Sequence, residues 1–357
     1  MRGSDHLETI QELADRINRP IRIMEVCGTH TMTAFRSGLR SLLPGNIKLL
    51  SGPGCPVCVT PGEFIDRAIA ISQLTGVSIA TFGDLVRVRG TESSLELERA
   101  KGAKVRVVYS AGDALLQAEQ NREQTVVFLG IGFETTIPTV AWTIKKAAAK
   151  NISNFLVLCA HKTMPQAMAG LLGGEEIRID GFLCPGHVSA IIGSRPYEFI
   201  CQDHHIPCVV AGFEPMDMVI AIEMLLKQLV ENRAQVENEY TRGVSEQGNL
   251  NAQALIREVF EESDAEWRGL GTIPGSGLSI RDAFRAHDAE PAYAELDLPK
   301  PAGQSQCICG DILRGTRTPP ECPLFRTSCT PATPAGACMV SSEGTCAAYY
   351  KYGGFGR

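Results

Sequence analysis

The stretch R-I-M-E-V-C-G-T-H, residues 22–30, contains the pattern that recurs along this chain of 357 residues. Apolar residues predominate in residues 22–26, which predicts a short, largely buried strand. The C-G-T-H motif follows at once, so Thr29 and His30 place polar donors beside the sulfur of Cys27. A helical pattern begins just after the motif, which puts Cys27 near a helix N-terminus. We therefore expect Cys27 to be a metal ligand or a nucleophile, although a lone cysteine is more often an inert buried thiol.

Seven further segments are short and apolar and predict strands of the same kind. They are residues 47–50, 77–81, 105–109, 125–130, 155–159, 181–184 and 207–211. Helical patterns lie between most of these strands, and this alternation predicts parallel sheets that are covered by helices. The strands form two consecutive sets of four, which predicts two similar parallel-sheet α/β domains at residues 1–122 and 123–240. A long helix is expected to begin at Pro215, because proline is favoured at the first helical position.

Polar motifs follow most of the predicted strands. They are G-P-G-C-P-V-C at residues 52–58, G-I-G-F-E-T-T with Glu134, A-H-K-T with His161, P-G-H-V-S with His187 and G-F-E-P with Glu214. Ligands of open α/β sheets bind at the carboxyl ends of the strands, so two such edges facing each other would form one cleft. Each of these two glutamates and two histidines has an alternative role as an ordinary core or surface residue. Together they predict a site on one sheet edge.

A pair of cysteines, Cys55 and Cys58, stands in the G-P-G-C-P-V-C motif. The T-P-G-E sequence that follows at residues 60–63 predicts a capped helix N-terminus just downstream, which would favour a thiolate. Half of a zinc site and a structural turn are alternatives, but we expect redox or metal-exchange chemistry. Four other cysteines lie in or beside apolar strands and are interpreted as packing thiols. These are Cys159, Cys184, Cys201 and Cys208.

Residues 241–357 differ in composition from the rest of the chain and predict a small third domain. Residues 290–340 are rich in Pro, Gly, Ser, Thr and Cys and show little periodicity. Six cysteines lie near the C-terminal end: Cys307, Cys309, Cys322, Cys329, Cys338 and Cys346. Iron–sulfur clusters usually take about four thiolates, so six can bind one cluster and leave a dithiol beside it. Zinc is the alternative metal, and either could replace a hydrophobic core.

Composition and charge exclude several classes of function. A net charge of −6 and the lack of any lysine- or arginine-rich run argue against nucleic-acid binding. No apolar stretch approaches the roughly 18 residues that span a bilayer. No Walker A sequence is present, and G-I-G-F-E-T lacks the third glycine of a dinucleotide fingerprint. We expect a cytoplasmic protein, monomeric when free, whose cysteines bind metal, cycle between redox states or pack in the core.

Several of these motifs together resemble those of the HypD family of hydrogenase maturation factors. The resemblance rests on C-G-T-H-T, G-P-G-C-P-V-C-V-T-P, G-I-G-F-E-T-T, P-G-H-V-S, G-F-E-P and C-I-C-G-D-I-L-R-G, and it spans nearly the whole chain. It implies two α/β domains and a C-terminal domain with a 4Fe-4S cluster. It also implies a scaffold on which the Fe(CN)2(CO) unit of NiFe-hydrogenase is assembled. The expected partners are a HypC-type iron chaperone and a HypE-type donor of cyanide.

The resemblance also implies roles for individual cysteines. Cys27 would bind the iron of the Fe(CN)2(CO) unit together with a cysteine of the HypC-type partner, and Cys55 and Cys58 would form a redox dithiol nearby. For the cluster we expect the ligands Cys307, Cys322, Cys329 and Cys346. Cys309 and Cys338 would then form a second dithiol beside the cluster. Thr29, His30 and nearby backbone N–H groups would donate hydrogen bonds to the cyanide nitrogens.

Two other functions remain possible on the residues alone. The first is an iron–sulfur disulfide reductase of the ferredoxin:thioredoxin reductase type, which would need the cluster and the dithiols. The second is an interaction protein stabilised by zinc. The C-G-T-H motif distinguishes the scaffold from the reductase, because a reductase has no use for an isolated third thiol between threonine and histidine.

Overall fold

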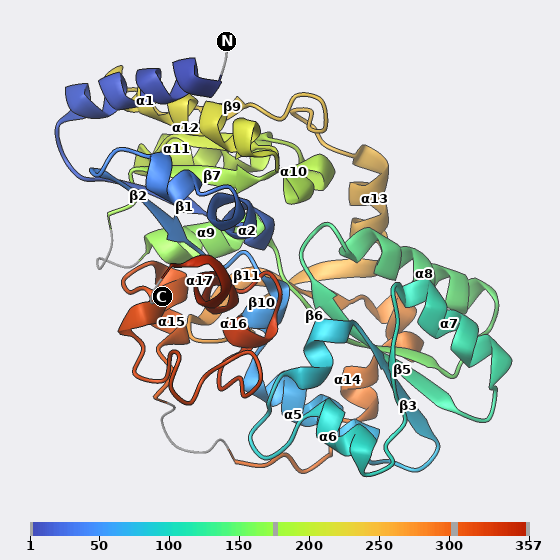
Figure 1. The fold of residues 1–357 in the computed structure, drawn as a ribbon. Helices are drawn as coiled ribbons and strands as arrows, with labels where there is room; N and C mark the ends of the chain where they lie inside the picture. The colour runs from blue at the N-terminus through green and yellow to red at the C-terminus, as the bar shows by residue number, and fades with distance from the viewer. Residues whose placement is uncertain (1–2, 174–177, 301–305, 355–357) are drawn as a thin grey trace.

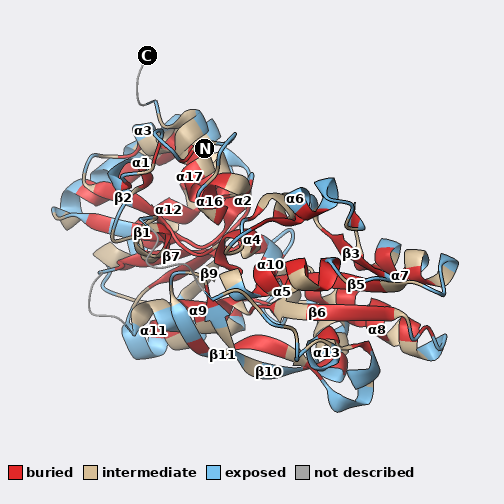
Figure 2. Ribbon diagram, turned by 90° about the horizontal axis from the view of Figure 1, so that it is seen from below, coloured by how far each residue is buried: buried red, intermediate tan, exposed pale blue. Residues whose placement is uncertain are grey.

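The computed structural model describes residues 3–173, 178–300 and 306–354. It has the expected α/β architecture, with two parallel sheets and a smaller cysteine-rich segment at the C-terminal end (Figure 1). The inner strands of both sheets are buried along nearly their whole length, whereas the edge strands β4 and β9 and the outer faces of the helices are partly exposed (Figure 2). Within these described ranges, no helix combines the length and the apolarity that crossing a membrane would require.

The first sheet is five-stranded and parallel, in the order β2-β1-β7-β8-β9. Its strands are β1 (Ile21–Glu25), β2 (Ile47–Ser51), β7 (Gly181–Pro185), β8 (Cys208–Ala211) and β9 (Val236–Asn238). Its helices are α1 (Gly3–Ile17), α2 (Gly28–Arg36), α3 (Leu39–Leu42), α10 (Gly186–Ile192), α11 (Glu198–His204) and α12 (Pro215–Val230). The long helix α12 begins at Pro215 as expected, and α1 packs against it (Figure 1).

The second sheet is four-stranded and parallel, in the order β4-β3-β5-β6. Its strands are β3 (Val77–Thr81), β4 (Val105–Val107), β5 (Thr125–Gly132) and β6 (Phe155–His161). Its helices are α5 (Gly62–Ser72), α6 (Leu95–Ala100), α7 (Ala111–Gln120), α8 (Ile137–Ala149) and α9 (Met164–Leu172), and the turn η1 (Gly83–Arg87) follows β3. The residues of β3 are buried on both faces, as parallel strands covered by helices require.

The expected grouping of the strands into two consecutive sets of four is wrong. β1 and β2 pair in one sheet with β7, β8 and β9, while β3 and β4 pair with β5 and β6. The boundary expected near residue 122 therefore falls inside the second sheet. The eight predicted segments are all strands. Their grouping could not be predicted, because a helical connection within one sheet and a helical connection between two sheets have the same local sequence pattern.

Residues 241–300 add an element that the sequence analysis missed. The helix α13 (Leu250–Val259) leads into an antiparallel hairpin of β10 (Phe260–Trp267) and β11 (Gly271–Ile280). The hairpin packs on β6 and α9 of the second sheet and is followed by η3 (Asp282–His287) and α14 (Ala289–Ala292). Among the described residues, the cysteine-rich part is thus 306–354, with α15 (Cys309–Arg314), η4 (Pro319–Glu321), α16 (Ala337–Val340) and α17 (Thr345–Tyr352).

The start of the helix after the C-P-V-C motif differs from expectation. Cys55 caps a short helix, α4 (Pro56–Val59), because its sulfur accepts the N–H of Cys58 at 3.3 Å. The Thr60 hydroxyl instead donates to the Pro56 carbonyl at 2.8 Å, so the predicted capping box does not form. Because the Thr60 hydroxyl bonds the preceding helix α4, it does not accept a hydrogen bond from the free N–H groups at the start of α5.

The loops after β1 and β2 are held together by main-chain contacts. Gly28 N–H donates to the Gly54 carbonyl at 3.1 Å, and Gly52 N–H donates to the Glu25 carbonyl at 2.8 Å. A side chain at Gly54 would overlap the main chain of Cys27. Glycine is therefore required at position 54 for the C-G-T-H and C-P-V-C motifs to approach each other.

Replacing Gly54 with alanine should destabilise the protein by about 1–3 kcal/mol, because the new methyl group has to push the two loops apart. Gly45→Ala is the matched control, since a side chain there meets no atom within 4 Å. Urea unfolding followed by circular dichroism would measure both changes. Equal stability of the two variants would contradict the close approach of the loops.

Candidate functional site

Cys27 lies at the end of β1, where it is the N-cap residue of α2. Its side chain is buried, and the backbone N–H groups of Thr29 and His30 point toward its sulfur. Burial is the main reason that the pKa of the thiol rises to about 12; the nearby Glu343 carboxylate adds to the rise and the two N–H groups oppose it. In the absence of a bound cation Cys27 is therefore a neutral thiol.

Glu343 of the C-terminal segment lies against the C-G-T-H motif. The sequence analysis did not identify it as a site residue. Its carboxylate accepts a hydrogen bond from the Thr29 hydroxyl at 2.9 Å. The missing side chain of Gly28 makes room for it, since an added Cβ would lie 2.6 Å from the Glu343 Cβ. Nothing near residue 343 marks it as a site residue, because the partner is 314 positions away in the sequence.

His30 joins the C-G-T-H motif to the first sheet. Its Nε2 donates to the carbonyls of Ala211 and Gly212, at 3.2 and 2.9 Å. With the ring proton used in this way, Nδ1 carries the lone pair, and no group of the described residues donates to it. Burial lowers the pKa of His30 to about 4, so the ring is neutral at pH 7. His30 therefore holds the start of α2 against the end of β8.

An aromatic stack connects three of the predicted motifs. The Phe213 ring lies 5.2 Å from His30 and 3.7 Å from His187, measured between ring centroids. His187 is exposed, and burial of part of its ring lowers its pKa. The structure thus brings C-G-T-H, P-G-H-V-S and G-F-E-P together at the carboxyl ends of β1, β7 and β8. Glu214 itself is exposed and caps α12 in a capping box with Asp217.

Glu134 and His161 lie elsewhere, at the ends of β5 and β6 in the second sheet, so the four expected residues do not share one sheet edge. Glu134 is buried and accepts the Met164 N–H at 2.9 Å; desolvation raises its pKa to about 7. His161 is buried edge-on against Phe260, and desolvation lowers its pKa to about 4. His161 is therefore neutral at pH 7, whereas Glu134 titrates close to that pH.

A second buried acid, Glu25, was also missed. It ends β1 two residues before Cys27, and its carboxyl accepts the Thr31 hydroxyl at 2.6 Å. Burial raises its pKa to about 7, against the opposing effect of Arg40. The sequence signal was present, since glutamate inside an otherwise apolar strand is costly unless it has partners.

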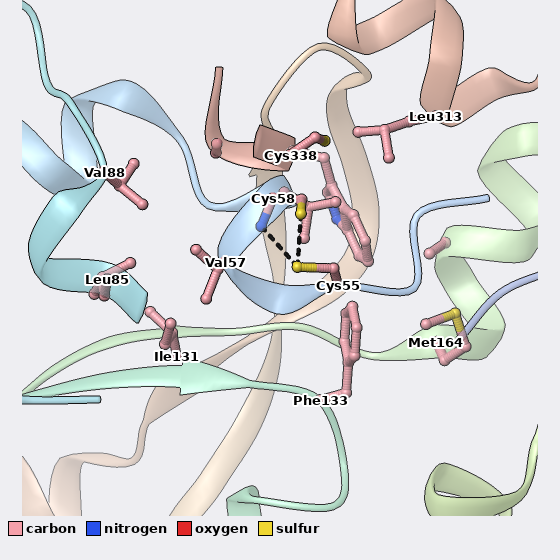
Figure 3. Packing of buried hydrophobic residues seen from close by; sticks show 14 of the residues in the cluster. Cys55, Val57, Cys58, Leu85, Val88, Ile131, Phe133, Met164, Leu313 and Cys338 are labelled. Carbon is pink, nitrogen blue, oxygen red and sulfur yellow. Dashed lines mark hydrogen bonds between the residues drawn. The ribbon is translucent and has the colours of Figure 1, made fainter. Parts of the chain in front are cut away.

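The C-P-V-C dithiol is packed in an apolar environment. The Cys58 thiol lies 2.6 Å from the Cys55 sulfur, and both residues are buried. Figure 3 shows the pair on α4, with Phe133 of the loop after β5 beneath Cys55 and Cys338 of α16 beside Cys58. Burial is the first cause of the raised pKa of Cys58, and the neighbouring thiols of Cys338 and Cys55 raise it further.

Cys338 links this dithiol to the cysteines of the C-terminal segment. Its sulfur lies 3.2 Å from the Cys309 sulfur, and it is also close enough to the Cys58 thiol for each to influence the pKa of the other. The sulfurs of Cys55, Cys58, Cys338 and Cys309 therefore form one continuous chain. The neighbouring thiols of Cys309 and Cys58 lower the pKa of Cys338 well below its usual value, although burial acts in the opposite direction.

The other four cysteines of the segment surround a common region. Cys346 experiences the charges of Cys307, Cys329 and Cys322, and burial is the first cause of its raised pKa. The Ala335 N–H donates to the Cys329 sulfur at 3.3 Å, a contact of the kind that stabilises cluster thiolates. Within the described ranges no three ligating side chains converge on a single point. A four-iron cluster does not need such a point, because each cysteine binds a different iron.

Comparisons with known proteins agree with the motifs. A sequence profile of the HypD family, described as the hydrogenase formation hypA family, matches residues 3–353. The chain is 47% identical to hydrogenase maturation factor HypD2 of Bradyrhizobium diazoefficiens, covering 94% of this chain and 90% of that protein. It is 46% identical to the HypD factors of Rhodobacter capsulatus and of Escherichia coli, in each case over 98% of this chain and 94% of the relative. The chain belongs to the HypD family of hydrogenase maturation proteins.

Proposed function

We propose that this protein is a scaffold on which the Fe(CN)2(CO) unit of NiFe-hydrogenase is assembled. Cys27 binds the iron together with a thiolate of a HypC-type partner, and a HypE-type partner supplies the cyanide. The iron unit is assembled on the scaffold and is then transferred from it, so it is a substrate of the protein. The observation that carries the proposal is the setting of Cys27, a lone thiol with backbone N–H donors at a helix N-terminus beside a buried dithiol.

The environment of Cys27 supports a role as ligand to low-spin Fe(II). Soft thiolates suit iron that carries carbonyl and cyanide. Burial raises the pKa of the free Cys27 thiol to about 12, and a bound metal ion would have to displace this proton, because a coordinating thiol is deprotonated. The N–H groups of Thr29 and His30 provide donors, whereas the His30 ring is already used by the carbonyls of Ala211 and Gly212.

The C-terminal cysteines support a resident 4Fe-4S cluster. Cys307, Cys322, Cys329 and Cys346 would be its ligands, since their sulfurs influence one another's charge and a backbone N–H donates to one of them. When bound, such a cluster supplies single electrons. Release of cyanide from a thiocyanate consumes two electrons and one proton. The sulfur chain from Cys309 to Cys55 then serves as the relay that carries this pair of electrons to the neighbourhood of Cys27.

The same sulfur chain favours a second candidate, a stand-alone iron–sulfur disulfide reductase. It would use Cys55 and Cys58 to reduce a protein disulfide. Both thiols are buried, at 4% and 1% exposure, which disfavours attack on a large protein substrate. The candidates differ in their need for Cys27, because only the scaffold requires it.

Replacing Cys27 with alanine should abolish binding of the iron unit while leaving the cluster in place. The protein would be purified anaerobically with its HypC-type partner, and infrared spectra would be recorded in the carbonyl and cyanide stretching region. We expect the native complex to show these bands and Cys27→Ala to show none, with equal brown colour in both samples. A Cys27→Ala sample that retains the bands would rule out Cys27 as the ligand, and one that loses its colour would contradict the separation of the two metal sites.

Single cysteine replacements should separate the cluster ligands from the second dithiol. In Cys322→Ala we expect bound iron to fall from about four atoms per chain to a residual level, because one of the usual four ligands is lost. Cys309→Ala is the matched control and should keep its iron, since Cys309 belongs to the sulfur chain. Iron and visible absorbance per chain give the answer, and an intact cluster in Cys322→Ala would refute the ligand set.

A further inference from the structure

Arg40 of the short helix α3 joins the C-terminal segment to α2. Its guanidinium carbon lies 4.5 Å from the centroid of the Phe35 ring and 5.6 Å from the centroid of the Tyr349 ring. The two rings also contact each other edge-on, with their centroids 4.6 Å apart. Phe35 belongs to α2 and Tyr349 to α17, and these two helices pack against each other (Figure 1). Because the faces of aromatic rings attract a guanidinium group, Arg40 strengthens the contact between the helices.

The N–H groups of Arg40 reach the ends of the first two strands. Nη1 donates to the Leu49 carbonyl at 2.7 Å and Nη2 to the Ser51 hydroxyl at 3.0 Å, so the side chain holds the end of β2. Nη2 also lies 3.7 Å from the Glu25 carboxyl group at the end of β1. The Glu25 side chain is fully buried and that of Arg40 is 19% exposed, so solvent screens this contact only weakly.

Glu25 in turn contacts the first turn of α2. Its Oε1, the atom that lies 3.7 Å from Arg40, accepts a hydrogen bond from the Thr31 hydroxyl at 2.6 Å. The Thr31 N–H donates to the Cys27 carbonyl at 3.1 Å. Two side chains, those of Glu25 and Thr31, therefore join Arg40 to Cys27. A displacement of Arg40 would remove the guanidinium group beside Glu25 and would loosen the start of α2.

The other end of this series of contacts lies one helical turn from an expected cluster ligand. Cys346 and Tyr349 stand at positions i and i+3 of α17, so they are neighbours on the surface of that helix. The C-terminal segment has only short helices, and ligation of its cysteines would order it in place of a hydrophobic core. The position of Tyr349 against Arg40 then depends on ligation at Cys346.

We propose that Arg40 is a positioning residue through which ligation of the C-terminal cysteines holds the C-G-T-H motif, and with it Cys27, in place. The inference rests on the resident cluster of the proposed function. It adds a coupling between the segment that would bind the cluster and the loop that would bind the iron unit. Arg40 lies outside all the motifs by which the chain resembles its family.

Hydrogen exchange of the full-length protein, followed by mass spectrometry, measures this coupling. One sample is the anaerobic protein with its cluster, the other is an iron-free preparation kept reduced, and iron per chain is determined in both. The readout is the exchange rate of residues 28–36 without the cluster divided by the rate with it. We expect a ratio of about ten or more in the native protein, because the contacts of Arg40 are worth about that factor.

Two variants should reduce this ratio to about three or less, because residues 28–36 then exchange quickly even with the cluster bound. Arg40→Gln removes the guanidinium group, and Tyr349→Leu removes the ring on α17 but leaves the contacts of Arg40 with β1 and β2 intact. Arg326→Gln is the matched control and should keep the native ratio. The Arg326 guanidinium also lies near two rings, at 5.8 Å from Phe325 and 5.2 Å from Tyr350, but both belong to the C-terminal segment itself.

Exchange of α8 in the second sheet is the internal reference, because general loss of stability would raise it together with that of residues 28–36. A native ratio near one, or a native-like ratio in both Arg40→Gln and Tyr349→Leu, would overturn the role of Arg40 and leave the cluster standing. A ratio that falls only together with faster exchange of α8 in both variants would overturn it too. A native protein without iron at its C-terminal cysteines would remove the proposed cluster, and this inference with it.

Discussion

The docking of the cysteine-rich segment onto α4 and α2 is the constraint on which the site depends. Residues 306–354 form only short helices and contain too few large apolar side chains for an independent core. Cys338 on α16 is placed by Cys58 on α4, and α17 is placed by the contact of Tyr349 with Phe35, whose ring centroids are 4.6 Å apart. The arrangement of these thiols therefore depends on the position of the loops that follow β1 and β2.

Local patterns were enough to predict the strands β1 to β8 and the polar residues that follow them. Short buried strands and the start of α12 at Pro215 have strong local signals, since apolar periodicity and proline position act within a few residues. The C-G-T-H and P-G-H-V-S motifs were expected on two facing sheet edges, but they meet because β1 and β7 are neighbours in one sheet, whose strands share an edge at their carboxyl ends. The rule fails where strands belong to different sheets, which is why Glu134 lies apart from His187.

The features that the sequence did not reveal depend on contacts between distant segments. The β10–β11 hairpin lacks a continuous apolar alternation, and its turn contains an arginine whose partners are Val59 and Thr60, about two hundred positions away. Nothing in the local sequence marks Glu343 as a site residue, because its place beside the C-G-T-H motif depends on the missing side chain of Gly28. A charged side chain acquires its role from the buried group it faces, and that pairing is set by the tertiary fold.

Three chemically identical thiols acquire different properties from their surroundings. Cys27 is buried beside the Glu343 carboxylate, and both effects raise its pKa against the opposing backbone N–H groups of Thr29 and His30. Cys58 is enclosed by apolar side chains and neighbouring thiols, which raise its pKa and keep the thiol protonated. Cys338 lies beside the thiols of Cys309 and Cys58, and these neighbours lower its pKa well below the usual value although burial opposes them. The surroundings of each thiol are therefore set by segments that are far apart in the sequence, and the loop that carries Cys55 also contacts the loop that holds Cys27.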